Sequence, residues 1–267
     1  MKKLFLMTML AMLALSSQAQ EKYDKDSLYK VVYASFKEDS TYKGDGGIKY
    51  LETAEQAIKN KHFANRFMAD FLMQLCFDSR FGRFSDCKDY VDKFMSYCKE
   101  DSLCQKINAA YAKFYKEFSP VFPGKPAPDF TFYDTKGKIH KLSELKGKML
   151  FIDIWGTWCG PCIEEIPYLK ALQEKYGNDK RIQIMSIACD KTDPKWKAFL
   201  EKRKADMTWS QYRVTTEGDK ILDDVYHVFG IPRFMLIDKN GNIISADTIR
   251  PSWKEFEPWL KEQLNKY

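Results

Sequence analysis

Hydrophobic residues repeat with two different periods along this 267-residue chain. From Glu21 to Pro120 they recur every three or four residues, the spacing of amphipathic helices, so four or five helices are predicted. The aromatic residues of these segments follow the same spacing, and we expect them to form a helical core rather than a ligand site. The predicted helices cover residues 27–36, 48–58, 63–77, 87–97 and 103–118.

After Pro128, apolar runs of strand length alternate with helical segments. This alternation is typical of a sheet covered by helices, so the second part of the chain is assigned to the α/β class. Turn residues around Gly137 and Gly241 predict two hairpins, and Ser252 to Glu255 fits a capping box that opens a last helix. The predicted strands are residues 130–133, 138–142, 148–155, 181–188, 234–237 and 243–248, and the predicted helices between them are residues 163–176 and 192–204.

A proline-rich segment separates the two patterns, with four prolines in residues 120–128. Proline and glycine clusters between periodic segments are typical of linkers. We therefore expect a helical domain of unknown role over residues 20–120, a linker over residues 121–128 and an α/β domain over residues 129–267.

Two cysteines with two residues between them stand at a predicted strand-to-helix junction, in the segment Trp158-Cys159-Gly160-Pro161-Cys162. At a helix start, unpaired N–H groups and the helix dipole favour an anion, so Cys159 should form a thiolate more readily than a free cysteine. Cys162 lies about one turn further along the same face, where it can displace a mixed disulfide. The pattern predicts disulfide exchange, with Cys159 as the attacking and Cys162 as the resolving cysteine.

Other uses of the cysteine pair fit less well. A structural zinc site needs four ligands, whereas His62, His140 and His227 are isolated from one another. A purely structural disulfide does not explain Gly-Pro at a helix start beside a tryptophan. Gly160 lets a substrate backbone approach closely, and Pro161 fits a first helical turn. Redox chemistry is therefore favoured, and neither a metal nor another cofactor is expected.

Residues 151–167, with the sequence FIDIWGTWCGPCIEEIP, resemble the active-site segment of the thioredoxin superfamily, specifically its TlpA/ResA-like extracytoplasmic branch. The resemblance runs from about Pro123 to the C-terminus and includes Gly230-Ile231-Pro232. It implies a thioredoxin-like fold, with a central mixed sheet, flanking helices and an N-terminal β-hairpin, preceded here by a small α-helical domain. It also implies a thiol:disulfide oxidoreductase.

The resemblance also assigns the substrate-binding loop. Pro232 matches the family's cis-proline beside the dithiol, and only X-Pro bonds adopt the cis form at low cost. Ile231 matches the preceding residue, whose backbone faces the substrate chain. Arg233 is less familiar at its position and leaves substrate preference open. The expected substrate-binding residues are Trp158, Gly160, Pro161, Ile231 and Pro232.

Two acids near the cysteines are catalytic candidates. Asp153 stands inside an apolar predicted strand, where a carboxylate is costly unless it titrates or finds partners, and it matches the buried acid below the dithiol in thioredoxin. If buried, Asp153 should have a raised pKa and could take the proton from Cys162. A strand-end carboxylate facing water is the other interpretation. Glu165 is the alternative proton acceptor, although the helix dipole alone favours acids early in a helix.

The N-terminus has the pattern of a signal peptide over residues 1–19. Lys2 and Lys3 precede an apolar run over residues 4–15, and small residues follow up to Ala19. The run is short for a membrane-spanning helix, which needs about twenty residues. We therefore expect cleavage after Ala19 and a soluble protein in the periplasm or elsewhere outside the cytoplasm, with an uncleaved membrane anchor as the alternative.

Charge and composition give no sign of a nucleic-acid partner. The net charge is +6 in total and +4 without Lys2 and Lys3, and it is spread without a basic cluster. With 45% apolar and 30% charged residues, the composition is that of an ordinary soluble globular protein.

Four of the seven cysteines fall in the helical region, in a compartment expected to be oxidising. Cys87 and Cys98 would be about 16 Å apart along one helix, too far for a bridge. Pairing across the turns is better, so Cys76–Cys87 and Cys98–Cys104 are the predicted structural disulfides. Cys189 is left over, and a buried inert thiol is expected there.

Two kinds of function remain. The favoured one is an extracytoplasmic thiol:disulfide oxidoreductase that reduces disulfides of specific proteins or peptides, with electrons from a membrane thiol reductase, as the resemblance implies for cytochrome c maturation. The alternative is a redox-sensing binding module in which the helical region recognises a partner. A peroxidase is disfavoured, because the usual proline-threonine lead-in to one peroxidatic cysteine is missing.

Overall fold

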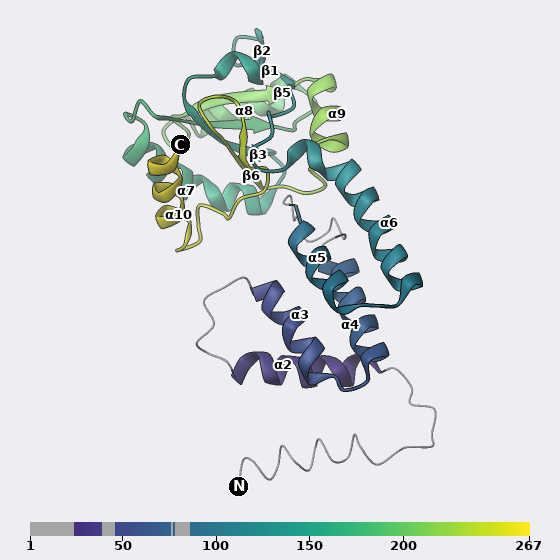
Figure 1. The fold of residues 1–267 in the computed structure, drawn as a ribbon. Coiled ribbons are helices and arrows are strands. Elements are labelled where there is room, and N and C mark those ends of the chain that lie inside the picture. The colour runs from purple at the N-terminus through teal and green to yellow at the C-terminus, as the bar shows by residue number, and fades with distance from the viewer. Residues whose placement is uncertain (1–23, 39–45, 76, 78–85) are drawn as a thin grey trace. The chain divides into compact units, whose positions relative to one another are not determined.

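The computed structural model describes residues 24–38, 46–75, 77 and 86–267, and the predicted signal peptide lies outside this part (Figure 1). The described chain forms two compact units. One holds the residues up to Leu72 together with Asp89–Ile107, and the other holds Met73–Lys88 and Asn108–Tyr267. The domain and linker boundaries inferred from the sequence remain predictions.

Every helix predicted before Pro120 is present. Their bounds are α2 (Lys25–Glu38), α3 (Gly46–Ala57), α4 (Lys61–Leu75), α5 (Lys88–Tyr97) and α6 (Asp101–Phe118). In the first unit, apolar side chains from α3 to α6 are fully buried, as helical periodicity requires of amphipathic helices. The carboxylate of Glu100, between α5 and α6, accepts hydrogen bonds from Asn65 at 2.7 Å and lies 2.9 Å from Nδ1 of His62.

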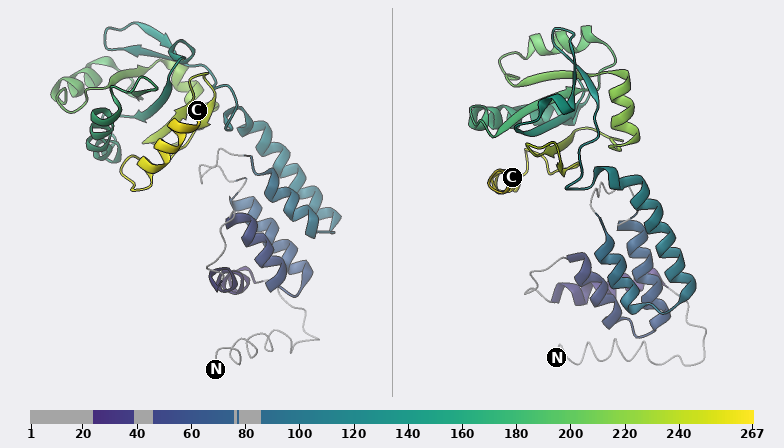
Figure 2. Two further views of the ribbon diagram at one scale, coloured as in Figure 1. Left: turned by 60° about the vertical axis from the view of Figure 1, so that its left-hand side comes forward. Right: turned by 45° about the horizontal axis from the view of Figure 1, so that its top comes forward.

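The second unit contains a seven-stranded mixed sheet with helices packed around it, the thioredoxin-like fold (Figure 2). The strand order is β2-β1-β5-β4-β3-β6-β7. Parallel pairs join β3 to β4 and β4 to β5, and the other neighbours are antiparallel. The strands are β1 (Thr131–Asp134), β2 (Ile139–Lys141), β3 (Met149–Trp155), β4 (Ile182–Ala188), β5 (Ser210–Val214), β6 (Arg233–Ile237) and β7 (Ile243–Ser245), and the helices are α7 (Gly160–Tyr176), α8 (Asp193–Lys202), α9 (Thr216–Asp224) and α10 (Phe256–Lys266).

Strand β3 is fully buried and carries the site at its end. Successive side chains of a strand point to opposite faces, so Phe151, Asp153 and Trp155 share one face. Phe151 and Trp155 belong to the apolar core that also contains Ile166 of α7 and Leu260 of α10. Asp153 therefore lies on the sheet face that α7 and α10 cover.

The sequence pattern missed two elements, β5 and α9. Four of the five β5 residues are only half-buried, and three of them are polar, so the strand lacks the apolar run by which the others are recognised. Helix α9 is short and rich in acids, and it begins with Thr215 accepting a hydrogen bond from the Gly218 N–H at 2.9 Å.

The capping box predicted at Ser252 is wrong. Helix α10 begins at Phe256, and its N-cap residue Glu255 makes no capping hydrogen bond with its side chain. The Ser252 hydroxyl instead donates to Glu165 of α7 at 2.7 Å. The Ser252 hydroxyl thus binds a residue distant in the sequence, whereas the local sequence predicted that it would cap the helix.

The proline-rich segment before β1 pairs with the β6–β7 hairpin. The Gly124 N–H donates to the Ile243 carbonyl at 2.7 Å, the Ile243 N–H donates to Lys125 at 2.8 Å, and the Ala127 N–H donates to Gly241 at 2.9 Å. These bonds bind residues 124–127 to the edge of the sheet.

No helix in the described part of the chain is both long and apolar enough to cross a membrane.

Candidate active site

Cys159 and Cys162 are joined by a disulfide at the start of α7. Cys159 is the N-cap residue of the helix, Pro161 lies in the first turn, and the Cys162 N–H donates to the Cys159 sulfur at 3.2 Å. The sulfur thus occupies the place of an N-cap oxygen, facing the N–H groups that would stabilise a thiolate. Both cysteines are buried, with 5% and 3% of their surface exposed.

The loop in front of the disulfide is held by Asp190, which sequence reasoning missed. Its carboxylate accepts hydrogen bonds from the Thr157 N–H at 2.9 Å and from the Thr157 hydroxyl. Asp190 follows the end of β4, which runs parallel to β3, so both strands deliver residues to the same sheet edge. The signal in the sequence that could have identified Asp190 was an acid shortly after the predicted strand at residues 181–188.

Trp158 is 69% exposed, yet its ring lies against the backbone of Gly156. A Cβ atom added at Gly156 would come within 2.9 Å of the indole Cε2 and 3.3 Å of Ile231 Cδ1. Only glycine at this position lets the indole and the Ile231 side chain close over the loop. An apolar surface therefore adjoins Cys159.

The bond between Ile231 and Pro232 is cis, and this loop lies beside the disulfide. The Ile231 carbonyl oxygen is 3.6 Å from the sulfur of Cys159. The chain enters β6 directly afterwards, where Arg233 stands opposite Ile154 of β3 in the antiparallel ladder. The end of the loop is thus fixed to the strand that leads into the cysteine pair.

Asp153 is buried, with 3% exposed, and its carboxylate has a single chain of partners. The Ser186 hydroxyl donates to it at 2.8 Å and accepts from the Trp209 indole N–H at 2.7 Å. Burial raises the pKa of Asp153 to about 7, the Ser186 hydrogen bond opposes this rise, and the charge of Glu165 adds to it. Asp153 can therefore gain or lose a proton near neutral pH.

Glu165 is also buried, with 3% exposed, and both of its carboxylate oxygens have partners. They accept from the Ser252 N–H at 3.0 Å and from the Ser252 hydroxyl at 2.7 Å. The acid on α7 thus holds the loop before α10. Neither Ser252 nor Ser186 was a candidate from the sequence, because their partners are distant along the chain.

The other cysteines lie in different surroundings. Cys98 and Cys104 carry free thiols, and the Cys104 sulfur lies 3.5 Å from the Cys98 carbonyl oxygen. The predicted Cys98–Cys104 bridge is therefore not formed in this structure, and the pairing stays a prediction. Cys87 is buried, and its predicted partner Cys76 lies outside the described residues. Burial raises the pKa of the Cys189 thiol to about 12, consistent with an inert thiol.

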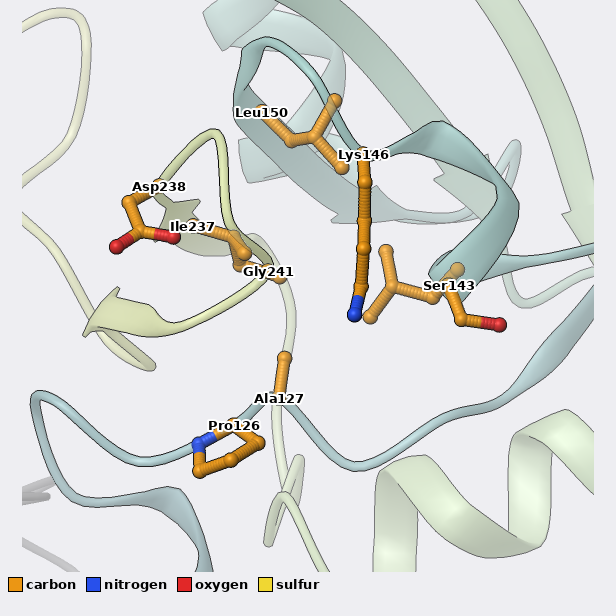
Figure 3. Close-up of a pocket in the computed structure, with 9 residues that line it drawn as sticks. Pro126, Ala127, Ser143, Lys146, Leu150, Ile237, Asp238 and Gly241 are labelled. Carbon is orange, nitrogen blue, oxygen red and sulfur yellow. The ribbon is translucent and has the colours of Figure 1, made fainter.

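Figure 3 shows a small pocket of about 60 Å³, which lies at the opposite end of β3 from the disulfide. Leu150 lines it and lies five positions before Trp155, which is about 16 Å along a strand. Its acid, Asp238, accepts from the N–H groups of Asn240 and Asn242, both at 2.8 Å, and so stabilises the hairpin turn. The pocket has no connection with the cysteine chemistry.

Among the described residues, no group of three or more His, Cys, Asp or Glu could hold a metal ion.

Comparison with known proteins gives consistent matches for this region. The family model described as Redoxin matches residues 122–258. Thiol-disulfide oxidoreductase ResA of Bacillus anthracis is 33% identical over 152 residues, covering 57% of this chain and 84% of that protein. ResA of Bacillus subtilis strain 168 is 31% identical over 141 residues, covering 50% and 75% respectively. The crystal structure of a Bacteroides vulgatus protein described as a thiol-disulfide oxidoreductase is 38% identical, with a TM-score of 0.50, and covers 54% of this chain and 98% of its own.

Proposed function

Because this chain belongs to the Redoxin family of the thioredoxin superfamily and is a thiol-disulfide oxidoreductase of the ResA type, we propose that it reduces disulfides of specific proteins outside the cytoplasm. One observation carries the proposal. The Cys159–Cys162 pair opens α7 with the Ile231 carbonyl 3.6 Å from the Cys159 sulfur, so the sulfur adjoins the backbone of the cis-proline loop.

The reaction is a two-step thiol–disulfide exchange that starts from the reduced pair. The Cys159 thiolate attacks one sulfur of the substrate disulfide, forming a mixed disulfide and releasing the other substrate sulfur as a thiolate. The Cys162 thiolate then attacks the Cys159 sulfur, which releases the second substrate thiolate and closes the Cys159–Cys162 disulfide. Two electrons pass from the pair to the substrate, and the released thiolates take up protons.

Cys159 is the better nucleophile because its sulfur faces the start of α7. The Cys162 N–H already points at that sulfur at 3.2 Å, and a thiolate there gains from the same N–H groups and dipole. Cys162 lies within the first turn of the helix, behind Cys159, and is bonded to it, which suits attack on the Cys159 sulfur.

Asp153 is the proposed proton acceptor for Cys162. Cys162 must lose its proton to resolve the mixed disulfide, and a buried carboxylate with a pKa of about 7 can accept one at neutral pH. Glu165 is the less suitable acceptor because Ser252 occupies both of its oxygens. We propose that Glu165 acts indirectly, by raising the pKa of Asp153 through its negative charge.

The substrate is expected to bind as an extended chain across Cys159. The backbone of Ile231, ahead of cis Pro232, would pair with the substrate backbone next to its cysteine. Trp158 offers apolar surface on one side, and a Cβ atom at Gly160 would meet nothing within 4 Å, so the backbone before Pro161 is open to approach. The proposed substrate-binding residues are Trp158, Gly160, Pro161, Ile231 and Pro232.

The compartment and the electron donor follow from the N-terminal pattern and the resemblance. A signal peptide over residues 1–19 would deliver the chain outside the cytoplasm, where a membrane thiol reductase is the proposed electron donor. The residues before the linker at 121–128 form the proposed helical domain. Cytochrome c maturation is one process that needs such a reductant.

The direct test is reduction of insulin disulfides by the dithiol form. Wild type should reduce insulin, Cys159→Ser should abolish the reaction, and Cys162→Ser should accumulate a mixed disulfide. A wild-type protein that cycles with no protein disulfide would exclude the reductase and favour a redox-sensing binding module. The equilibrium potential of the Cys159/Cys162 pair against glutathione tests whether the protein is a reductant. A value of about −120 mV is typical of strong oxidants and would contradict the proposal.

A further inference from the structure

A buried arginine directly follows the cis-proline. Arg233 is the first residue of β6, and only 10% of its side chain is exposed. Its guanidinium reaches two other segments of the same unit. Nη2 donates to the His227 carbonyl at 3.4 Å, Nη1 donates to the Ala246 carbonyl at 3.5 Å, and Nε lies 3.4 Å from the Asp247 carboxylate. One side chain thus connects the loop before Pro232 to the chain after β7.

His227 is the point at which the loop turns. Its φ of 51° lies in the left-handed region, which is uncommon for a residue other than glycine. Its carbonyl accepts from the Phe229 N–H at 3.0 Å as well as from Arg233. Its ring packs on Phe118 with centroids 4.3 Å apart, and Nε2 lies 3.4 Å from the Glu117 carbonyl. The start of the loop is therefore held from both its backbone and its side chain.

Stability alone does not account for this arrangement. Burying the Arg233 guanidinium costs solvation, and buried charges of this kind are often replaceable by apolar residues without loss of stability. Burial lowers the pKa of Arg233 and raises that of Asp247, so each charge is held at a cost that the pair only partly offsets. The Arg233 guanidinium does supply a planar fork of donors, which fixes the carbonyl groups of His227 and Ala246 relative to each other.

We propose that Arg233 is a positioning residue for disulfide exchange, which holds the loop of residues 227–232 so that the Ile231 backbone stays beside the Cys159 sulfur. This inference rests on the proposed function and deepens it. A polypeptide substrate needs that backbone as a pairing edge, whereas a small disulfide needs only the sulfur. Arg233 should therefore matter for protein substrates and much less for small ones.

The test compares two substrates in two variants. In Arg233→Met, the KM for insulin should rise about tenfold, roughly the effect of losing one well-placed polar interaction, while kcat changes less. The rate with a small aromatic disulfide and the alkylation rate of reduced Cys159 should stay within about twofold of wild type. Arg233→Lys keeps the charge without the fork, so it should give an intermediate KM and remains informative if the methionine variant does not fold.

Two further variants separate positioning from stability. Arg233→Met with Asp247→Asn also removes the carboxylate that faced Arg233, so it should regain part of the lost stability without regaining the low KM. Asp134→Asn breaks the pair with His140 in the β1–β2 hairpin, which β5 and β4 separate from β3, and should lower stability without changing KM. An active wild type with an unchanged insulin KM in both Arg233 variants would overturn the inference alone. An inactive wild type would overturn the proposed function and this inference with it.

Discussion

The hydroxyl of Ser186 donates a 2.8 Å hydrogen bond to the carboxylate of Asp153, and the two residues stand opposite each other in the parallel β3–β4 ladder. The sheet register thus determines the only hydrogen bond that the described structure gives the side chain of this buried acid. The pKa of Asp153, about 7, follows from burial that this bond only partly offsets. The titration of a proposed catalytic group is therefore linked to the pairing of two strands.

Asp153→Asn should change how stability depends on pH. The pKa of Asp153 is raised in the folded chain to about 7, from an ordinary value near 4. The folded state therefore favours the protonated acid, and this contribution to stability is complete below about pH 4 and is lost as the pH rises through about 7. Denaturant unfolding from pH 4 to 8 should show this decline in wild type, and the asparagine variant should lack it. Equal slopes in the two proteins would contradict the assignment.

Asp153→Asn should also slow the resolving step. Without an acceptor for the Cys162 proton, the mixed disulfide should persist about 10² to 10⁴ times longer, the usual contribution of a general base. Quenched-flow trapping with a peptide disulfide measures this lifetime. Alkylation of Cys159 serves as the control and should be nearly unchanged, because the first sulfur depends on the helix start.

Ser186→Ala should move the titration of Asp153 to higher pH. The hydrogen bond from Ser186 lowers the pKa of Asp153, so its removal lets burial raise the pKa further. The pH midpoint of the resolving step, or a carboxyl NMR titration, reports the shift. A midpoint that stays in place or falls would show that the hydroxyl does not act on the carboxylate.

Glu165→Gln should lower the pKa of Asp153, because the negative charge of Glu165 raises it. The variant should also lose about 1–2 kcal/mol of stability, since the bonds from Ser252 then end on a neutral amide. Ser252→Ala is the matched control. It should lose comparable stability while the Asp153 titration stays at its wild-type pH. The same titration shift in both variants would assign the effect to the loop rather than to charge.

Gly156→Ala should displace Trp158 with little effect on stability. The added Cβ would come within 2.9 Å of the indole, which is 69% exposed and can swing away at a cost below about 1 kcal/mol. We expect a shifted indole NMR signal for Trp158 and an insulin KM raised several-fold. Gly160→Ala is the spectroscopic control, because its Cβ would meet nothing within 4 Å. An unmoved Trp158 signal in Gly156→Ala would contradict the packing.

Cys98 and Cys104 should form a disulfide when the purified protein is oxidised. The Cys104 sulfur is already 3.5 Å from the Cys98 carbonyl, because Cys98 directly follows α5 and Cys104 lies in the first turn of α6. Burial raises the pKa of Cys98 to about 11, so its bridge should form slowly at neutral pH. Peptide mapping without reductant checks the link, and recovery of both peptides unlinked after oxidation would refute it.

The sequence by itself determined the class of this protein and the residues of its reacting pair. Helical spacing before Pro120, alternating strands and helices after Pro128, and the segment around Cys159 and Cys162 are local properties, readable because periodicity and turn chemistry act over a few residues. The same locality explains the errors. The half-polar strand β5 has no strong pattern of its own, and Ser252 was assigned to a helix cap because only its near neighbours were visible.

Only the tertiary structure decided the partners of the buried polar groups. Ser186 for Asp153, Ser252 for Glu165, Asp190 for Thr157 and His227 for Arg233 are each brought together by strand order or by a loop that returns to the sheet. Inside a protein an unpaired polar group is costly, so each had to find a partner there, but which partner depends on how distant segments meet. The local sequence therefore identifies the reacting cysteines, whereas the fold decides which polar groups surround them.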